Sequence, residues 1–260
     1  MFDVINFTKV KVIVMITGEI KNRIDMVRLE DIDIFFDVRS DNTGRDPDSS
    51  SPTLRAYHQA LWSKPLPNGQ VLCLTTNKDS YLKWNDMVFG SDSITASFRY
   101  ERTKVLLEQV KQVVPSYTDF FENYDRKTYT IGGTIIFPKH HDSINQKRGC
   151  RSKIRDRWDL TLECIRRFYI REDSPLYDIF QKDKSFFDLF VNFKGYVDFF
   201  FLQDCVDEDY RVKLWLDTPL FESNPFPKNV DEYLGWIDSQ LDFVKKRAER
   251  IADYCKSNSN

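Results

Sequence analysis

The chain has 260 residues, and its 38 Lys and Arg against 40 Asp and Glu give a formal net charge of −2. Apolar residues make up 41% and aromatic residues 15%, which excludes a disordered chain, since so much apolar surface offsets the entropy of ordering when buried. The balance of charge excludes a uniformly basic nucleic-acid coat protein. A chain of this length also needs no disulfide or metal ion to hold a core together.

The cysteines, the histidines and the N-terminus bear on the compartment. Five cysteines are widely spaced with no C-x-x-C pair, a pattern typical of free thiols in a reducing compartment. The three histidines, His58, His140 and His141, lie apart from any cysteine pair, so we expect no zinc and no other cofactor. The apolar run at residues 10–16 is too short to cross a bilayer and lacks a cleavage site. We therefore expect a cytoplasmic protein with no membrane contact.

The first part of the chain predicts a strand, a loop and a helix. Apolar and polar residues alternate over residues 31–38, as in a half-buried strand. Residues 40–53 are rich in Asp, Ser, Asn, Gly and Pro, which predicts a long loop. Residues 53–62 predict a short helix, and the Pro-Leu-Pro-Asn-Gly sequence within residues 64–69 is a strong turn signal.

The middle of the chain mixes strand and helix signals. Gly132 and Gly133 interrupt a β-rich run over residues 129–137, which indicates close approach of a ligand or another backbone, or a bulge. Residues 195–206 suit a buried strand or a buried helix equally well. The other predicted elements are strands over residues 71–75 and 94–98, helices over 104–114 and 154–169, and helical turns over 176–193.

The clearest element is the helix predicted over residues 229–255. Its apolar residues fall on one stripe with charged residues opposite, as in a terminal helix packed on a core. We interpret residues 1–30 as an N-terminal extension and residues 31–260 as one globular domain. The predicted fold class is α+β or mixed α/β, with a central sheet flanked by helices and a long C-terminal helix.

Positive charge concentrates in residues 147–171. This segment has nine basic and three acidic residues, a net charge of +6, so the other 235 residues sum to −8. Such asymmetry is typical of a face that binds an anionic partner, most often a phosphate backbone. The alternative is a ladder of salt bridges along the helix, in which Asp156 and Asp159 are structural partners of the arginines. The residues predicted to contact nucleic acid here are Asn145, Lys147, Arg148, Arg151, Lys153 and Arg157.

A second mixed cluster covers residues 44–64. Asp46 or Asp48 is suited to orient a water molecule or to stabilise a cationic transition state. Aromatic side chains nearby are suited to stack on a base, and cationic ones to hold phosphate. The alternative is an ordinary helix entry, since Asp-Pro-Asp followed by serines is a common capping sequence. The predicted nucleic-acid contacts of this cluster are Arg45, Arg55, Tyr57, His58, Trp62 and Lys64.

From Asp33 onward the sequence resembles a bacterial family of unknown function. The resemblance covers nearly all of the chain after the extension, and it assigns no chemistry by itself. The segments that carry it are residues 46–48, 51–55, 57–58, 61–69, 131–133, 137–138, 148–149, 154, 156–157, 159–167, 174–176 and 195–204, and Trp158 departs from the family pattern.

Two short motifs resemble those of another class. Gly44-Arg45-Asp46-Pro47 is similar to the Gly-Gln-Asp-Pro water-activating loop of uracil-DNA glycosylases. Ser174-Pro175-Leu176 is similar to the Ser-Pro-Leu minor-groove loop of the same enzymes, which adds Ser174 and Leu176 to the predicted DNA contacts. A related resemblance is to bacterial antiphage glycosylases, which remove a glucosylated modified cytosine from phage DNA.

These observations predict a DNA glycosylase that hydrolyses the N-glycosidic bond of a modified base and leaves abasic sites. Such an enzyme needs pocket walls for the extruded base, a positive clamp on the backbone and a carboxylate for the sugar cation. One alternative is a metal-dependent nuclease or other phosphodiester enzyme, with Asp37, Asp41, Asp46 and Asp48 as ligands. The other is a nucleic-acid-binding protein without catalysis.

Overall fold

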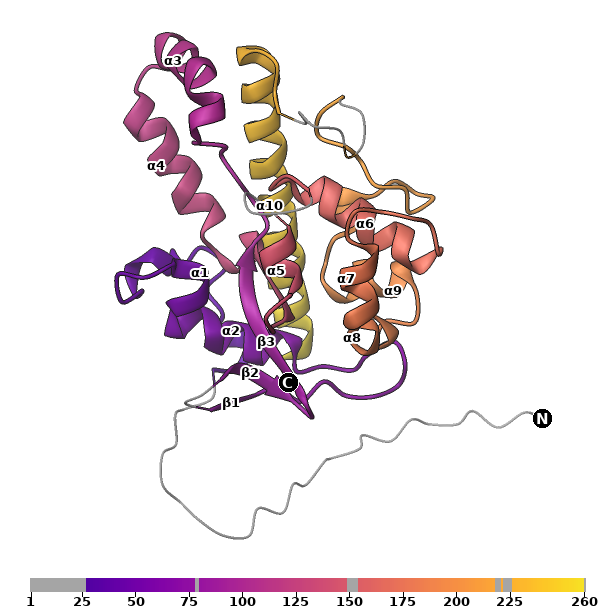
Figure 1. Ribbon diagram of the computed structural model, residues 1–260. Helices are drawn as coiled ribbons and strands as arrows, with labels where there is room; N and C mark the ends of the chain where they lie inside the picture. Colours follow the sequence, from indigo (N-terminus) through magenta and orange to yellow (C-terminus); the bar gives the residue numbers. More distant parts are fainter. Residues whose placement is uncertain (1–26, 78–79, 149–153, 218–220, 222–225, 260) are drawn as a thin grey trace, which may run out of the picture.

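The computed structural model in Figure 1 describes residues 27–77, 80–148, 154–217, 221 and 226–259. Within these residues the chain forms one mixed α+β unit with a four-stranded antiparallel sheet and ten α-helices. This confirms the predicted fold class and the long C-terminal helix. No helix in the described part of the chain is long and apolar enough to cross a membrane.

The strands lie in the order in which they occur along the chain. They are β1 (Thr75–Asn77), β2 (Ser80–Trp84), β3 (Met87–Ser93) and β4 (Thr134–Pro138). β4 pairs with β3 from Phe89 opposite Pro138 to Ser93 opposite Thr134. Every residue of β4 is buried, and the strand contacts α5.

Helices make up most of the rest. The α-helices are α1 (Pro47–Ser50), α2 (Pro52–Trp62), α3 (Lys104–Val113), α4 (Tyr117–Thr128), α5 (Ile144–Lys147), α6 (Trp158–Tyr169), α7 (Tyr177–Lys182), α8 (Lys184–Asp188), α9 (Phe193–Phe199) and α10 (Val230–Asn258). Short 3-10 helices are η1 (Leu29–Asp31), η2 (Val38–Ser40), η3 (Glu101–Thr103), η4 (Ile131–Gly133) and η5 (Gln203–Cys205).

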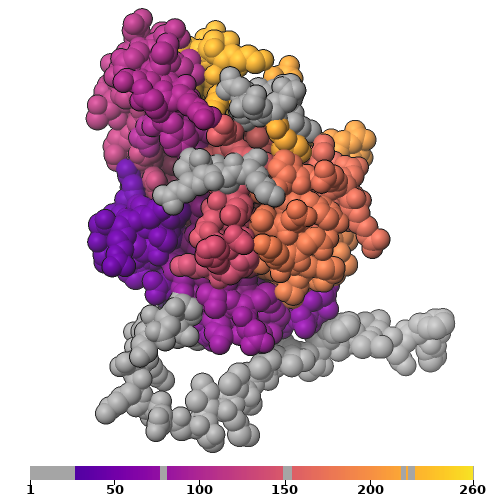
Figure 2. Space-filling view, in the orientation of Figure 1, coloured from indigo at the N-terminus to yellow at the C-terminus, as the bar shows by residue number. Residues whose placement is uncertain are grey.

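Two apolar cores flank α10. The larger one joins the sheet to α2 and to the Phe-rich helices α6–α9, and the smaller one joins α3 and α4 to the first half of α10. Figure 2 shows the α3–α4 lobe directly above the α1–α2 region on the left of the molecule. The buried guanidinium of Arg247 on α10 donates to the carbonyls of Phe200, Gly132 and Thr134, which ties α10 to both the sheet and the Phe-rich helices.

The Gly132-Gly133 pair marks close approach of backbone. A Cβ on Gly133 would lie 1.8 Å from the carbonyl oxygen of Thr128, and one on Gly132 would lie 2.9 Å from that of Val244. The sequence left ligand approach, backbone approach and a bulge open, and the structure selects backbone approach. The tight turn lets the chain pass from α4 into β4 directly beneath α10.

Several predicted helices are confirmed, and three predicted strands are wrong. The helices over residues 53–62, 104–114 and 229–255 correspond to α2, α3 and α10, and the ambiguous run at 195–206 contains helical α9 and η5. Residues 31–38 do alternate in burial, but they pack on helices and form no strand. Residues 71–75 give only a single bridge before β1.

Residues 94–98, the third segment wrongly predicted as a strand, form none for a specific reason. The chain leaves β3 after Ser93, and the backbone N–H and carbonyl of Ala96 are then both bonded by the side chain of Gln240 on α10. That amide takes the place of a neighbouring strand, so the segment bends away from the sheet. The bend opens a cavity beside the end of β3.

Candidate functional site

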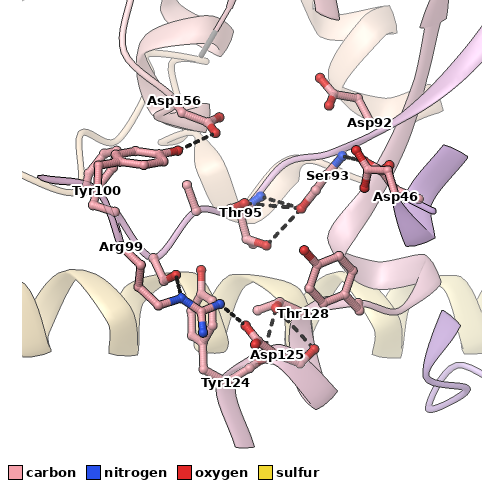
Figure 3. Close-up of a pocket in the computed structure, with 15 residues that line it drawn as sticks. Asp46, Asp92, Ser93, Thr95, Arg99, Tyr100, Tyr124, Asp125, Thr128 and Asp156 are labelled. Carbon is pink, nitrogen blue, oxygen red and sulfur yellow. Dashed lines mark hydrogen bonds and ion pairs between the residues drawn. The ribbon is translucent and has the colours of Figure 1, made fainter. Parts of the chain in front are cut away.

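A cavity of about 320 Å³ lies where β3, the segment after it, α1 and the end of α4 meet. Five aspartates from four separate parts of the chain line it. Figure 3 shows Asp46 and Asp92 on one side, Asp156 beside Tyr100 on another, and Asp125 beside Arg99 on a third. The aspartates are Asp46, Asp48, Asp92, Asp125 and Asp156.

Asp48 has the smallest exposed fraction of these five residues. It is 6% exposed, and its Oδ2 accepts a hydrogen bond of 2.6 Å from the backbone N–H of Ser93. Burial first, and then the charges of Asp92 and Asp46, raise the pKa of Asp48 to about 8. Asp48 therefore holds a proton at neutral pH and shares a hydrogen bond with the exposed carboxylate of Asp46.

Asp92 forms an ion pair with Arg148. The Arg148 guanidinium is buried and donates to Asp92 at 2.5 Å, to the carbonyl of Ser93 at 2.9 Å and to Asp156 at 3.3 Å. Burial raises the pKa of Asp92 to about 6, against the opposing effect of Arg148. The cavity thus holds a protonated carboxyl group and an ionised one side by side, which is a common arrangement for acid–base catalysis.

Aromatic and hydroxyl groups form the rest of the wall. Phe98 and Tyr124 are buried, whereas Tyr100 is 37% exposed and its hydroxyl lies 3.4 Å from Asp156. Arg99 donates to Asp125 at 2.7 Å at the opposite end (Figure 3). Flat aromatic faces beside hydrogen-bond acceptors suit a planar or ring-shaped ligand with several N–H or O–H groups.

Most residues predicted to stack on a base lie in the core instead. Trp62 and His58 have no exposed surface; Trp62 Nε1 donates to His58 Nδ1 at 2.8 Å, and His58 Nε2 lies 3.0 Å from the hydroxyl of Ser91. Burial lowers the pKa of His58 to about 3, so this ring is neutral. Tyr57 is 6% exposed. Trp62 packs on Phe199 of α9, His58 contacts Ser91 of β3, and Tyr57 packs on Phe36. All three lie on the inward face of amphipathic α2, so they are unavailable to a nucleic acid.

The three cationic residues of this cluster that were predicted to contact phosphate have different environments in the structure. Lys64 is buried, its Nζ donates to the carbonyl of Phe199 at 2.7 Å, and aromatic rings surround it, so it too is withdrawn from solvent. Arg55 packs over the ring of Tyr81. Arg45 is exposed beside Asp46 and remains a candidate contact.

Several basic side chains of residues 147–171 are also buried or paired with carboxylates. Arg148 bridges two cavity aspartates, and Arg157 is fully buried against Asp159. Lys147 pairs with Asp142 at 3.2 Å. Predicted phosphate contact by Arg148 and Arg157 is therefore wrong, because their charges offset buried carboxylates. Arg151 and Lys153 lie outside the described residues.

The alternative prediction for the helical charges is confirmed in part. Glu163 pairs with Arg166 at 2.8 Å and with Arg167 at 2.9 Å along α6. The predicted minor-groove loop is wrong, since Leu176 is fully buried among the Phe-rich helices and Ser174 is 9% exposed. Neither residue is on a protruding loop.

The carboxylates of the nuclease alternative do not converge. Asp37 is ion-paired with Arg39 at 2.6 Å, and Asp41 accepts a hydrogen bond from the N–H of Thr53 at 3.0 Å. Within the described ranges, no three His, Cys, Asp or Glu residues are grouped so as to hold a metal ion. Asp46 and Asp48, by contrast, both line the cavity, and Asn145 lines a hollow next to it.

Sequence reasoning missed most of the cavity. Asp92 lies in a polar Gly-Ser-Asp-Ser stretch that did not resemble a strand, and Asp125 and Tyr124 lie on α4, which was not predicted. The alternative of an ordinary helix entry is borne out, since Asp46 stands at the N-cap of α1 and Ser51 caps α2 by accepting from the N–H of Leu54; Asp48 itself caps neither helix. The sequence feature that could have identified Asp92 as a site residue is its position as an acidic residue among polar residues at the end of a strand.

Comparison with known proteins gives one match. No curated protein and no solved structure matches the chain. A family model described as a family of unknown function, DUF6994, matches residues 32–251. This span includes all of the cavity aspartates and the whole of the sheet. The chain belongs to the DUF6994 family of unknown function.

Proposed function

We propose that the cavity is the active site of a DNA glycosylase, which hydrolyses the bond between a modified base and its deoxyribose. The observation that carries the proposal is the pair formed by protonated Asp48 and exposed Asp46, with Asp92 as a third carboxyl group beside them. Hydrolysis of a glycosidic bond requires one group that gives a proton and another that accepts one.

The chemistry divides between the two residues. Asp46 orients a water molecule and offsets the positive charge that develops on the sugar. The water oxygen bonds to C1′ as the C1′–N bond breaks, the water proton passes to Asp46, and the departing base takes the proton of Asp48. The hydrogen bond between the two carboxyl groups then returns the proton from Asp46 to Asp48, which restores the starting state.

The remaining wall suits the base. Tyr100, which is partly exposed, offers aromatic surface to an extruded base, which loses its stacking when it leaves the duplex. Asp125 and Asp156 accept hydrogen bonds from amino or hydroxyl groups. A cytosine bearing a hydroxymethyl-linked glucose carries both kinds of donor, so glucosylated phage DNA is the substrate that we propose, with antiphage defence in the bacterial cytoplasm as the role.

The test compares abasic-site formation by the wild type and by Asp46→Asn. Asn keeps the shape but neither balances a positive charge nor takes a proton, so turnover should fall by about 10²–10⁴-fold. Asp238→Asn, an exposed change on α10, is the matched control and should retain full turnover. Full turnover in Asp46→Asn, with an unchanged melting temperature, would contradict the proposal.

A further inference from the structure

A second hollow lies on the other side of the same three carboxyl groups. It has a volume of about 640 Å³, and Asp46, Asp48 and Asp92 line both it and the cavity described above. The three carboxyl groups therefore form a partition between two adjoining spaces. A ligand whose reacting bond lies over this partition extends into both.

The far wall of the second hollow differs in charge from the cavity. It carries Lys139, His140 and His141, all exposed, from the segment that follows β4. Among the described residues no carboxylate pairs with Lys139, whereas the nearby Lys147 and Lys182 both pair with Asp142, at 3.2 Å and 3.1 Å. Lys139 is thus the cation of this wall whose charge is available to a ligand.

The backbone of β3 fixes where Lys139 lies. Its side chain runs over Gly90, with Cδ 3.3 Å from the position that a Cβ would occupy there. Asn145 stands on the same wall; its Nδ2 donates to the carbonyl of Ser91 at 3.3 Å, and its buried Oδ1 has no described partner. His140 is anchored by Asp183 at 3.0 Å. In this wall, Asn145 and His140 are each held by a polar contact within the protein, whereas the ammonium group of Lys139 pairs with no carboxylate among the described residues.

We infer that the second hollow binds a backbone phosphate of the nucleic-acid substrate through Lys139. The inference rests on the proposed function for the position of the glycosidic bond over Asp46 and Asp48. The base then occupies the first cavity, which has two further aspartates, Asp125 and Asp156, and no lysine, and the sugar crosses the partition. The phosphate reaches the wall where the positive charge lies.

The test is binding of a fluorescent single-stranded oligonucleotide by anisotropy at several salt concentrations. Lys139→Ala should lower the magnitude of the log–log salt slope by about 0.7 and weaken binding about eightfold at 50 mM salt, as expected for one lost phosphate contact. Lys139→Arg keeps the charge and should keep the slope. Lys182→Ala, whose lysine is tied to Asp142, is the control and should also keep it.

An unchanged slope in Lys139→Ala, or an equal change in Lys182→Ala, would overturn the inference. The readout is independent of catalysis, so it separates the two proposals. If Lys139→Ala binds as the wild type does while abasic sites still form, the phosphate site is wrong and the glycosylase stands. If no abasic sites form but the slope changes as expected, the phosphate site stands and the glycosylase is wrong.

Discussion

The protonated state of Asp48 should make the protein lose stability as the pH rises, and Asp48→Asn should remove that loss. The carboxyl group has a pKa of about 8 in the folded protein, well above its ordinary value of 3.8. Below pH 4 the group is protonated in both states and favours neither. As the pH rises from 4 to 8, the unfolded chain releases the proton while the folded protein keeps it, so unfolding becomes easier.

The size of the effect follows from the shift. One pKa unit corresponds to about 1.4 kcal/mol, so this group lowers the free energy of unfolding by up to about 1.4 kcal/mol per pH unit across that interval. Asn does not ionise and retains an oxygen that can accept from the N–H of Ser93. The variant should therefore equal the wild type near pH 4 and be more stable than it at pH 8.

Urea denaturation of both proteins at half-unit steps from pH 4.5 to 8.5 measures this difference directly. The Asp238→Asn control should follow the wild-type curve at every pH, because that aspartate is exposed on α10. Parallel curves for the wild type and Asp48→Asn would refute the reasoning, since they would mean that Asp48 is ionised in the folded protein and has no proton to give to a departing base.

Two further substitutions test how the buried charges support the cavity. Arg148→Ala leaves Asp92 and Asp156 without their shared guanidinium and should lower the free energy of unfolding by about 3–5 kcal/mol, measured by urea denaturation at pH 7; a stability within 1 kcal/mol of the wild type would contradict the buried bridge. Asp159→Asn should cost a similar amount, rather than the 0–1 kcal/mol of an exposed pair, because Asp159 is buried with Arg157 and accepts from the N–H of Trp215 at 3.0 Å. A loss below 1 kcal/mol there, with a wild-type thermal transition, would show that this pair is exposed in solution.

The sequence predicted the helices better than the strands, for physical reasons visible in single residues. The stripe of apolar residues on α10 repeats at helical spacing over about six turns, so local pattern alone identifies it. β3 ends in Gly-Ser-Asp-Ser because its end faces a polar cavity, and this removes the alternation that marks a strand. The segment after it has strand-like residues, but the side chain of Gln240 takes its backbone hydrogen bonds.

The candidate site was predictable in its first two carboxylates and in little else. Asp46 and Asp48 are close in sequence, beside a proline and a run of serines, so local pattern identified them. Asp92, Asp125 and Asp156 reach the same cavity from distant segments, and only the tertiary fold brings them together. The arginines of the basic segment were wrongly predicted to contact phosphate for the same reason. A sequence does not reveal which charges are buried against carboxylates, as the charge of Arg148 is.

Release of free base from glucosylated phage DNA in the presence of EDTA is the most direct test of the central claim. We predict a chromatographic peak of the modified base, an equal number of abasic sites reactive toward an aldehyde probe, and no strand cleavage before alkali treatment. Strand breaks that carry intact modified bases and that depend on added Mg²⁺ or Mn²⁺ would contradict the assignment of the cavity to glycosidic hydrolysis.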